Sequence, residues 1–114
     1  YNCKSLSTEA RLIELEEELL KIKWDVLGLC ETRIKGEQLS TLKTRHLFFY
    51  TGNEKDSYGG VGFLVHKKYA NKVVEIKSIS PRVCYLILRL SNRYSLKIVQ
   101  GYAPTCDYDD TIVE

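Results

Sequence analysis

The sequence predicts an α/β fold in which one helix precedes a set of β-strands. Leucine and isoleucine recur at helical spacing early in the chain, and residues 47–102 contain five short apolar segments separated by polar loops. The 114 residues are 44% hydrophobic and 28% charged, a composition typical of a folded domain with its own core. The net charge of +2 is too small to indicate a partner. No apolar stretch reaches the length of a membrane span, so we expect no membrane partner.

The helix is predicted between residues 7 and 22. Ser7 or Thr8 suits the N-cap position, and Glu9 suits the first turn. The apolar side chains that follow fall on one side of a helix, with glutamates on the other faces. The residues expected on the apolar face are Leu12, Leu15, Leu19 and Ile22, with Ile13 and Leu20 beside them.

A short apolar strand at residues 24–30 ends on a carboxylate, a hydroxyl and a guanidinium. Its poor alternation predicts burial on both faces. The three polar residues are Glu31, Thr32 and Arg33. Ligands gather at the carboxyl ends of strands in open α/β sheets, which makes Glu31 a candidate metal ligand. The alternative is an ordinary solvated strand end.

Residues 1–3 have the character of the last residues of an earlier strand. A strand, a helix and a second strand form a crossover unit whose strands are normally parallel and end at the same edge of the sheet. We therefore expect Asn2 to lie near Glu31. Together they would offer oxygen ligands to a hard cation such as Mg²⁺, which takes one or two carboxylates with waters and substrate phosphate.

Strands are also predicted at residues 47–51, 61–66, 73–79, 83–90 and 94–102, with antiparallel pairing between them. The polar residues 91–93 predict a hairpin. Gly59 and Gly60 end the polar joint at residues 52–60, where their backbone freedom suits a bulge or a close approach. The last strand ends at Tyr102, for which a packed aromatic side chain with a satisfied hydroxyl is the alternative to a catalytic role.

The histidines and cysteines indicate neither a catalytic base nor a zinc site. His66 is expected at a strand end and His46 at the surface. The four cysteines lack zinc-ligand spacing and are expected to be reduced thiols in an intracellular compartment. Cys30 and Cys84 fall in apolar strands, where a thiol behaves as a small hydrophobic group.

Four landmarks of the sequence, in matching order and spacing, resemble the endonuclease/exonuclease/phosphatase superfamily. They are Tyr1-Asn2 and residues 25–33, 59–65 and 101–105. Within the superfamily the chain is most similar to the endonuclease domains of non-LTR retrotransposons, which are relatives of the abasic-site DNA repair endonucleases. It is also similar to host proteins resembling craniofacial development protein 2. The resemblance covers essentially all of the chain.

The resemblance implies a two-sheet α/β sandwich of the DNase I-like type that hydrolyses phosphodiesters in DNA with Mg²⁺ or Mn²⁺. It implies that Glu31 is a catalytic metal ligand, that Asn2 positions the metal or the scissile phosphate, and that Tyr102 contacts the phosphate. Such a metal polarises the phosphoryl oxygen while the phenol donates to it. Thr105 stands where the repair enzymes have Asn, and Arg33 is expected near the DNA backbone.

Members of the superfamily carry later landmarks that do not follow Glu114: an Asp-x-Asn strand end, a further metal-side Asp and a late Asp-His pair. Residues 1–114 are therefore expected to be the N-terminal half of the domain, truncated at both ends and inactive alone. The intact domain is expected to be intracellular and nuclear, with DNA as partner and a reverse transcriptase domain in the same polyprotein. The alternatives are another phosphoesterase of the superfamily, acting on inositol lipids or RNA tails, and a domesticated or decayed copy that serves as an interaction module.

Overall fold

The computed structural model describes residues 1, 5–53 and 59–101. This part of the chain forms an α/β structure with two antiparallel sheets, one α-helix and one short 3₁₀ helix. The elements are α1 Glu9–Leu19, β1 Val26–Cys30, β2 Glu37–Thr41, β3 Leu47–Thr51, β4 Val61–Val65, η1 Lys67–Lys72, β5 Val73–Ser80, β6 Val83–Arg89 and β7 Ser95–Gly101. The predicted α/β class with two sheets and the antiparallel pairing of the later strands are confirmed.

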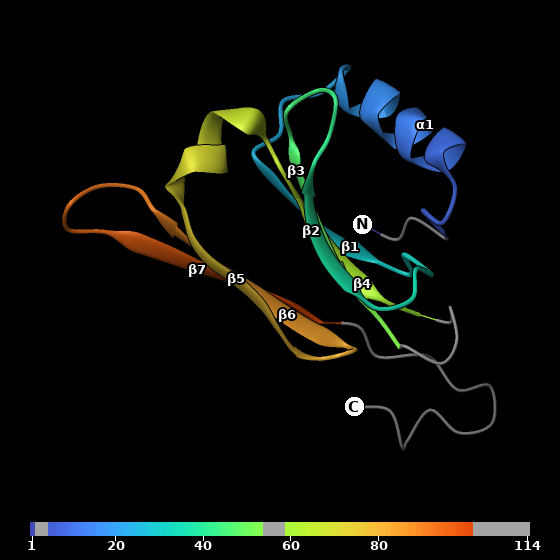
Figure 1. Cartoon of the computed structure of the whole chain (residues 1–114). Coiled ribbons are helices and arrows are strands. Elements are labelled where there is room, and N and C mark those ends of the chain that lie inside the picture. Colours follow the sequence, from blue (N-terminus) through green and yellow to red (C-terminus); the bar gives the residue numbers. More distant parts are fainter. Residues whose placement is uncertain (2–4, 54–58, 102–114) are drawn as a thin grey trace, which may run out of the picture.

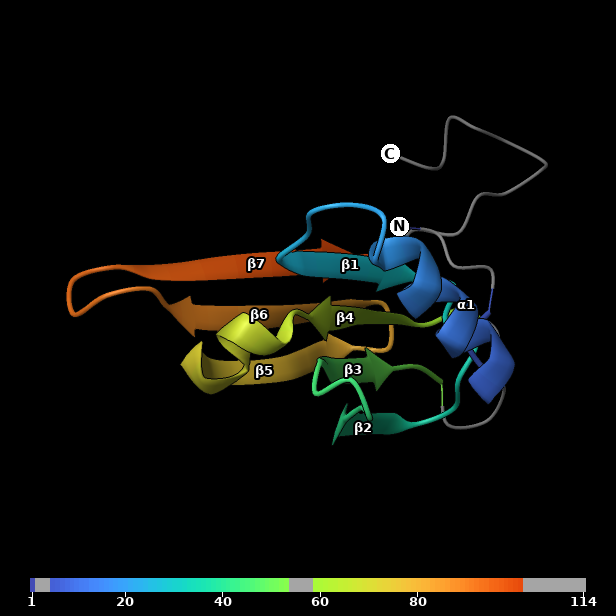
Figure 2. The same cartoon turned by 90° about the horizontal axis from the view of Figure 1, so that it is seen from above.

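The molecule has three layers. The first sheet has the strand order β1-β4-β3-β2, and the second has the order β5-β6-β7. Helix α1 covers one face of the first sheet, and the second sheet covers the other face (Figure 1). Seen from above, the strand axes of the two sheets are nearly parallel or antiparallel to one another (Figure 2), as in aligned sheet packing.

Two hydrophobic cores hold these layers together. The core between the sheets contains alternate residues of β3, β4 and β6: Phe49, Val61, Phe63, Val65, Cys84, Leu86 and Leu88. The core beneath α1 contains Leu6, Leu15, Leu19, Leu29, Phe48 and Leu64. Strand β1 contributes to both, since Val26 and Cys30 pack between the sheets while Leu27 and Leu29 pack beneath the helix. Both faces of this strand are therefore covered, but the predicted burial is complete only at Leu29, and the other four residues stay partly exposed.

The helix begins where the sequence predicts. The Oγ1 atom of Thr8 accepts a hydrogen bond of 3.3 Å from the backbone N–H of Arg11, which is the N-cap geometry. Leu15 and Leu19 are each only 5% exposed against the first sheet. The buried face thus follows the predicted spacing over the first three turns.

The end of the helix differs from the prediction. The helix stops at Leu19 with Leu20 as its C-cap, so the chain turns toward β1 before Ile22 can join the buried face. Leu20 is 84% exposed, Ile22 60% and Ile13 46%. The expectation that Ile22 extends the apolar face was wrong for this reason.

Strand β2 and helix η1 were not predicted. Strand β2 is polar and mostly exposed, and it is ordered by pairing with β3 at the edge of the first sheet. The five strands predicted after residue 46 are all present as β3 to β7, and within the described residues each ends within one residue of its predicted bounds. The predicted hairpin is present too, with the Leu90 N–H donating to the Tyr94 carbonyl oxygen at 2.9 Å.

Within the described residues, no helix has the length and apolar character needed to cross a bilayer.

Candidate functional site

Strand β1 carries Glu31 to one end of the first sheet. Cys30 is the last residue of β1 to pair with β4, opposite Val61. The chain then turns with positive φ angles of 57° at Glu31 and 55° at Arg33. A left-handed conformation costs a residue other than glycine about 1–2 kcal/mol. Surrounding contacts must therefore hold this turn in place.

Three backbone hydrogen bonds fix the turn at residues 31–33. The Thr32 N–H donates to the Gly60 carbonyl oxygen at 3.4 Å, and the Arg33 N–H donates to the Gly59 carbonyl oxygen at 2.7 Å. The Thr32 carbonyl oxygen accepts from the Leu6 N–H at 2.8 Å. The turn is thus held between the segment before α1 and the segment before β4.

Gly60 supplies the close approach that the sequence predicts. Its φ is +96°, and a Cβ atom at this position would lie 2.4 Å from the Oγ1 atom of Thr32. Both the backbone conformation and the space beside Thr32 therefore require glycine. The expectation for the Gly59-Gly60 pair is confirmed.

The three side chains of the turn differ in burial. Thr32 is fully buried, and among the described residues its hydroxyl has no hydrogen-bond partner. The Glu31 side chain is 22% exposed, so its carboxylate is accessible to solvent. Nη2 of Arg33 lies 4.0 Å from Oε2 of Glu31, and the Arg33 side chain is 46% exposed. An ion pair this long and this exposed adds little stability.

Tyr1 lies beside β1 in a parallel arrangement. Its terminal ammonium donates to the Gly28 carbonyl oxygen at 2.8 Å, and its carbonyl oxygen accepts from the Cys30 N–H at 2.9 Å. This pair of bonds to the residues on either side of Leu29 is the pattern of a parallel bridge. Tyr1 therefore lies parallel to β1 as expected, whereas the rest of the predicted strand, with Asn2, lies outside the described residues.

Strand β7 approaches β1 from the second sheet. The Nε2 atom of Gln100 donates to the Leu29 carbonyl oxygen at 3.4 Å. Gly28 makes room for this side chain, because a Cβ there would lie 2.2 Å from Oε1 of Gln100. Strands β1 and β7 run in the same direction and end on the same side of the sandwich (Figure 2). Tyr102 and Thr105 lie outside the described residues.

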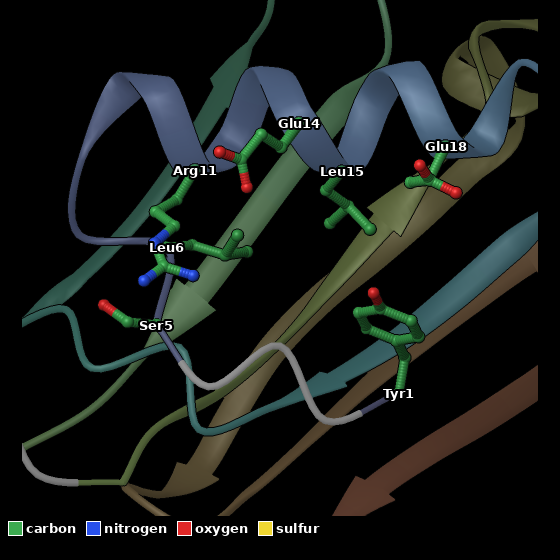
Figure 3. Close-up of a pocket in the computed structure, with 7 residues that line it drawn as sticks. All are labelled: Tyr1, Ser5, Leu6, Arg11, Glu14, Leu15 and Glu18. Atoms are coloured by element: carbon green, nitrogen blue, oxygen red, sulfur yellow. The ribbon is translucent and has the colours of Figure 1, made fainter.

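A small hollow of about 140 Å³ lies between α1 and Tyr1. The Tyr1 ring points from the edge of the sheet toward the helix, which contributes Arg11, Glu14 and Glu18 (Figure 3). Glu31 does not line this hollow. The hollow adjoins the candidate site, because Tyr1 and Leu6 in its lining are hydrogen-bonded to Cys30 and Thr32.

A cluster of three rings lies at the opposite, amino-terminal end of β1. The ring centroids are 4.9 Å apart for Trp24 and His46, 5.0 Å for Trp24 and His66, and 4.7 Å for the two histidines. His46 is only 9% exposed, so its expected surface position was wrong. Its burial follows from packing against the other two rings, and its Nδ1 accepts a hydrogen bond of 2.9 Å from the Lys67 N–H.

The electrostatics of this cluster favour neutral imidazoles. Burial is the main cause that lowers the pKa of both His46 and His66. His66 and Lys67 lower the pKa of His46 further, and Lys68 and Lys67 do the same for His66. The Nδ1 atom of His66 accepts from the Lys68 N–H at 3.2 Å. Each ring is thus held by a hydrogen bond that only an unprotonated Nδ1 can accept. Sequence reasoning missed the cluster, because its members are far apart in the chain.

The described residues provide one carboxylate contact for a divalent cation at the end of β1. In this part of the chain no three His, Cys, Asp or Glu side chains gather as a metal-ligand group. Glu31 combines partial exposure with a fixed backbone, which suits one ligand of a Mg²⁺ ion that keeps several waters.

Comparisons with family models, with curated proteins and with solved structures found no match.

Proposed function

We propose that the end of β1 is the metal-binding side of a phosphodiesterase site, in a DNA endonuclease domain of the DNase I-like type that uses Mg²⁺ or Mn²⁺. The observation that carries the proposal is the Glu31 carboxylate, which is accessible to solvent at a strand end and sits on a backbone turn with two positive φ angles. Strained turns of this kind persist where the surrounding contacts over-determine them, and they cluster at functional sites.

The directions of the neighbouring strands support the proposal. Tyr1, which pairs in parallel with β1, precedes Asn2 in the sequence. Strand β7, which runs in the same direction as β1, precedes Tyr102. Both segments therefore lead toward the end of the sandwich where Glu31 lies, as the proposed site requires.

The chemistry of the residues is consistent with phosphodiester hydrolysis. A bound cation would polarise the phosphoryl oxygen and neutralise the charge that develops on it. Glu31 would hold that cation, and the exposed guanidinium of Arg33 can donate charge-assisted hydrogen bonds to a DNA phosphate. The long contact between Glu31 and Arg33 is weak enough to be exchanged for these partners.

Metal binding tests the proposal directly. Titration of the chain with Mn²⁺, followed by electron paramagnetic resonance of the free ion, should show binding that Glu31→Gln weakens by about tenfold or more. Glu17→Gln makes the same change on the exposed side of α1 and should leave binding unchanged. Equal Mn²⁺ affinity in the Glu31→Gln variant and the parent chain would exclude Glu31 as a ligand.

A nicking assay tests the expected inactivity of these 114 residues alone. Supercoiled plasmid should stay intact in Mg²⁺, because the site needs groups beyond Glu31, Asn2 and Tyr102. Nicking that depends on Mg²⁺ and disappears in Glu31→Ala would contradict this expectation.

The coding sequence after Glu114 separates the enzyme from the non-catalytic alternative. Asp-x-Asn and Asp-His landmarks in that sequence would support the enzyme, whereas a stop codon would support a decayed copy. Turnover of DNA, RNA and phosphoinositide by the chain that contains those landmarks would then identify the substrate class.

A further inference from the structure

A cavity of about 260 Å³ opens at the amino-terminal end of β1, at the other end of the strand from Glu31. Its apolar wall includes the exposed side chains of Leu20 and Ile22. The rest of the lining is aromatic and basic, and it comprises Lys23, Trp24, His46, His66, Lys67 and Lys68. This concentration of cations around aromatic rings indicates an anionic ligand.

The two imidazoles offer hydrogen-bond donors to the cavity. Nδ1 of His46 accepts from the Lys67 N–H, and Nδ1 of His66 accepts from the Lys68 N–H. A neutral imidazole that accepts at Nδ1 carries its proton on Nε2. Both residues line the cavity, so their Nε2–H groups are candidate donors besides the lysine ammonium groups.

The charges that face the histidines leave the cavity cationic. Nζ of Lys68 is paired with Oδ1 of Asp25 at 2.8 Å, which neutralises both charges. Among the described residues, Lys67 has no ion pair within 4.0 Å, and neither does Lys23. Asp25 is the carboxylate that acts on His66, and Glu16 of α1, which accepts a hydrogen bond from Thr44, is the one that acts on His46.

We propose that this cavity binds a small compound with a phosphate group, which the ammonium groups of Lys23 and Lys67 and the Nε2–H groups of the two histidines hold beside Trp24. Charge-assisted hydrogen bonds of this kind are stronger than neutral ones, and lysine is a common phosphate ligand. The cavity is separate from the end of β1, so this proposal does not depend on the proposed nuclease function.

The two histidines can donate to the anion in their neutral form. Burial is the main cause that lowers the pKa of both rings, with His66 and Lys67 lowering that of His46 further and Lys68 and Lys67 that of His66, while Glu16 and Asp25 oppose this. Nδ1 of each ring accepts a backbone N–H, so the proton of the neutral ring is on Nε2 and no titration of the histidines is needed for binding. A phosphate monoester gains a proton near pH 6, so the titrations are made at pH 7.5, where it is a dianion.

The fluorescence of Trp24, the single tryptophan of the chain, reports binding directly. Titrations with inorganic phosphate and with phenyl phosphate should give saturable changes. Lys67→Gln should weaken binding about tenfold, the loss expected for one charged hydrogen bond. Lys72→Gln removes the same charge from the same helix at a residue that does not line the cavity, and it should leave binding unchanged.

Tighter binding of phenyl phosphate would identify a phosphate ester as the natural class of ligand, and equal binding would identify free phosphate. Absence of a saturable change, or an equal loss in Lys67→Gln and Lys72→Gln, would overturn the proposal. Thermal unfolding of each variant checks that it is folded. Glu31→Gln should keep full phosphate affinity even where Mn²⁺ binding is lost, so the two proposals fail independently.

Discussion

Gly60→Ala tests whether the turn at Glu31 depends on the close contact between Gly60 and Thr32. The new Cβ would lie 2.4 Å from Oγ1 of Thr32, whose side chain is fully buried and cannot rotate into solvent. Placing this clash in a packed site costs about 1–3 kcal/mol. The φ of +96° adds about 1–2 kcal/mol for a residue with a Cβ. The variant should therefore lose about 2–5 kcal/mol of unfolding free energy, a large part of the 5–15 kcal/mol of an ordinary domain.

Urea unfolding measures this loss as a lower midpoint with an unchanged slope. The double variant Thr32→Ala/Gly60→Ala removes the clashing oxygen but keeps the backbone strain. The double variant should lose less unfolding free energy than the two single variants lose together. The difference should be about 1–3 kcal/mol, which is the cost of the clash. A Gly60→Ala variant within about 0.5 kcal/mol of the parent chain, or strict additivity in the double variant, would refute the reasoning.

Three further predictions concern the cores and the ring cluster. The urea midpoint should fall as the pH drops below about 6.5, because the unfolded histidines gain protons before His46 and His66, whose folded pKa is lower. The midpoint should stop falling below the pKa values of the two histidines in the folded chain, and it should fall less in His66→Gln. A midpoint that stays constant from pH 8 to pH 5 would contradict this prediction. Leu64→Ala should cost about 2–5 kcal/mol in urea unfolding, because this side chain is fully buried, whereas Leu20→Ala, 84% exposed, should change stability by less than about 0.5 kcal/mol. Iodoacetamide at pH 8 should modify Cys84 only in urea, because burial raises the pKa of its thiol to about 12. Mass spectrometry that shows Cys84 modified in the folded chain as fast as in the chain unfolded by urea would disprove this.

The sequence predicts the elements whose burial follows a simple period. Alternation in β6 places Cys84, Leu86 and Leu88 in the core between the sheets, and the helical spacing of Leu15 and Leu19 places them beneath α1. These patterns can be recognised in the sequence because each element buries one face, so that apolar residues recur with the period of the helix or strand. The close approach at Gly60 was predictable for a related reason, since adjacent glycines before an apolar strand are typical of strained backbone.

The features that the sequence does not predict depend on contacts between distant residues. Strand β2 is polar and nonperiodic, and it is a strand because its backbone pairs with β3. Glu31 and Arg33 are not residue types that favour positive φ, and their conformation follows from hydrogen bonds to Gly59 and Gly60. His46 is buried because three segments bring Trp24 and His66 against it.

The alignment of the candidate site is decided in the interior of the sandwich rather than at its end. A strand advances about 3.3 Å per residue, and a shift of one residue reverses the face to which every side chain points. The position of β7 is fixed by its pairing with β6 from Ser95 to Gly101, and the Gln100 side chain, which fills the space over Gly28 and donates to the Leu29 carbonyl oxygen, adds a contact with β1. Because these contacts come before the strand ends, they determine how far β7 extends relative to Glu31. A side chain at position 28 would displace Gln100 and remove its contact with β1, while β7 kept its pairing with β6 and the turn at residues 31–33 kept its own hydrogen bonds.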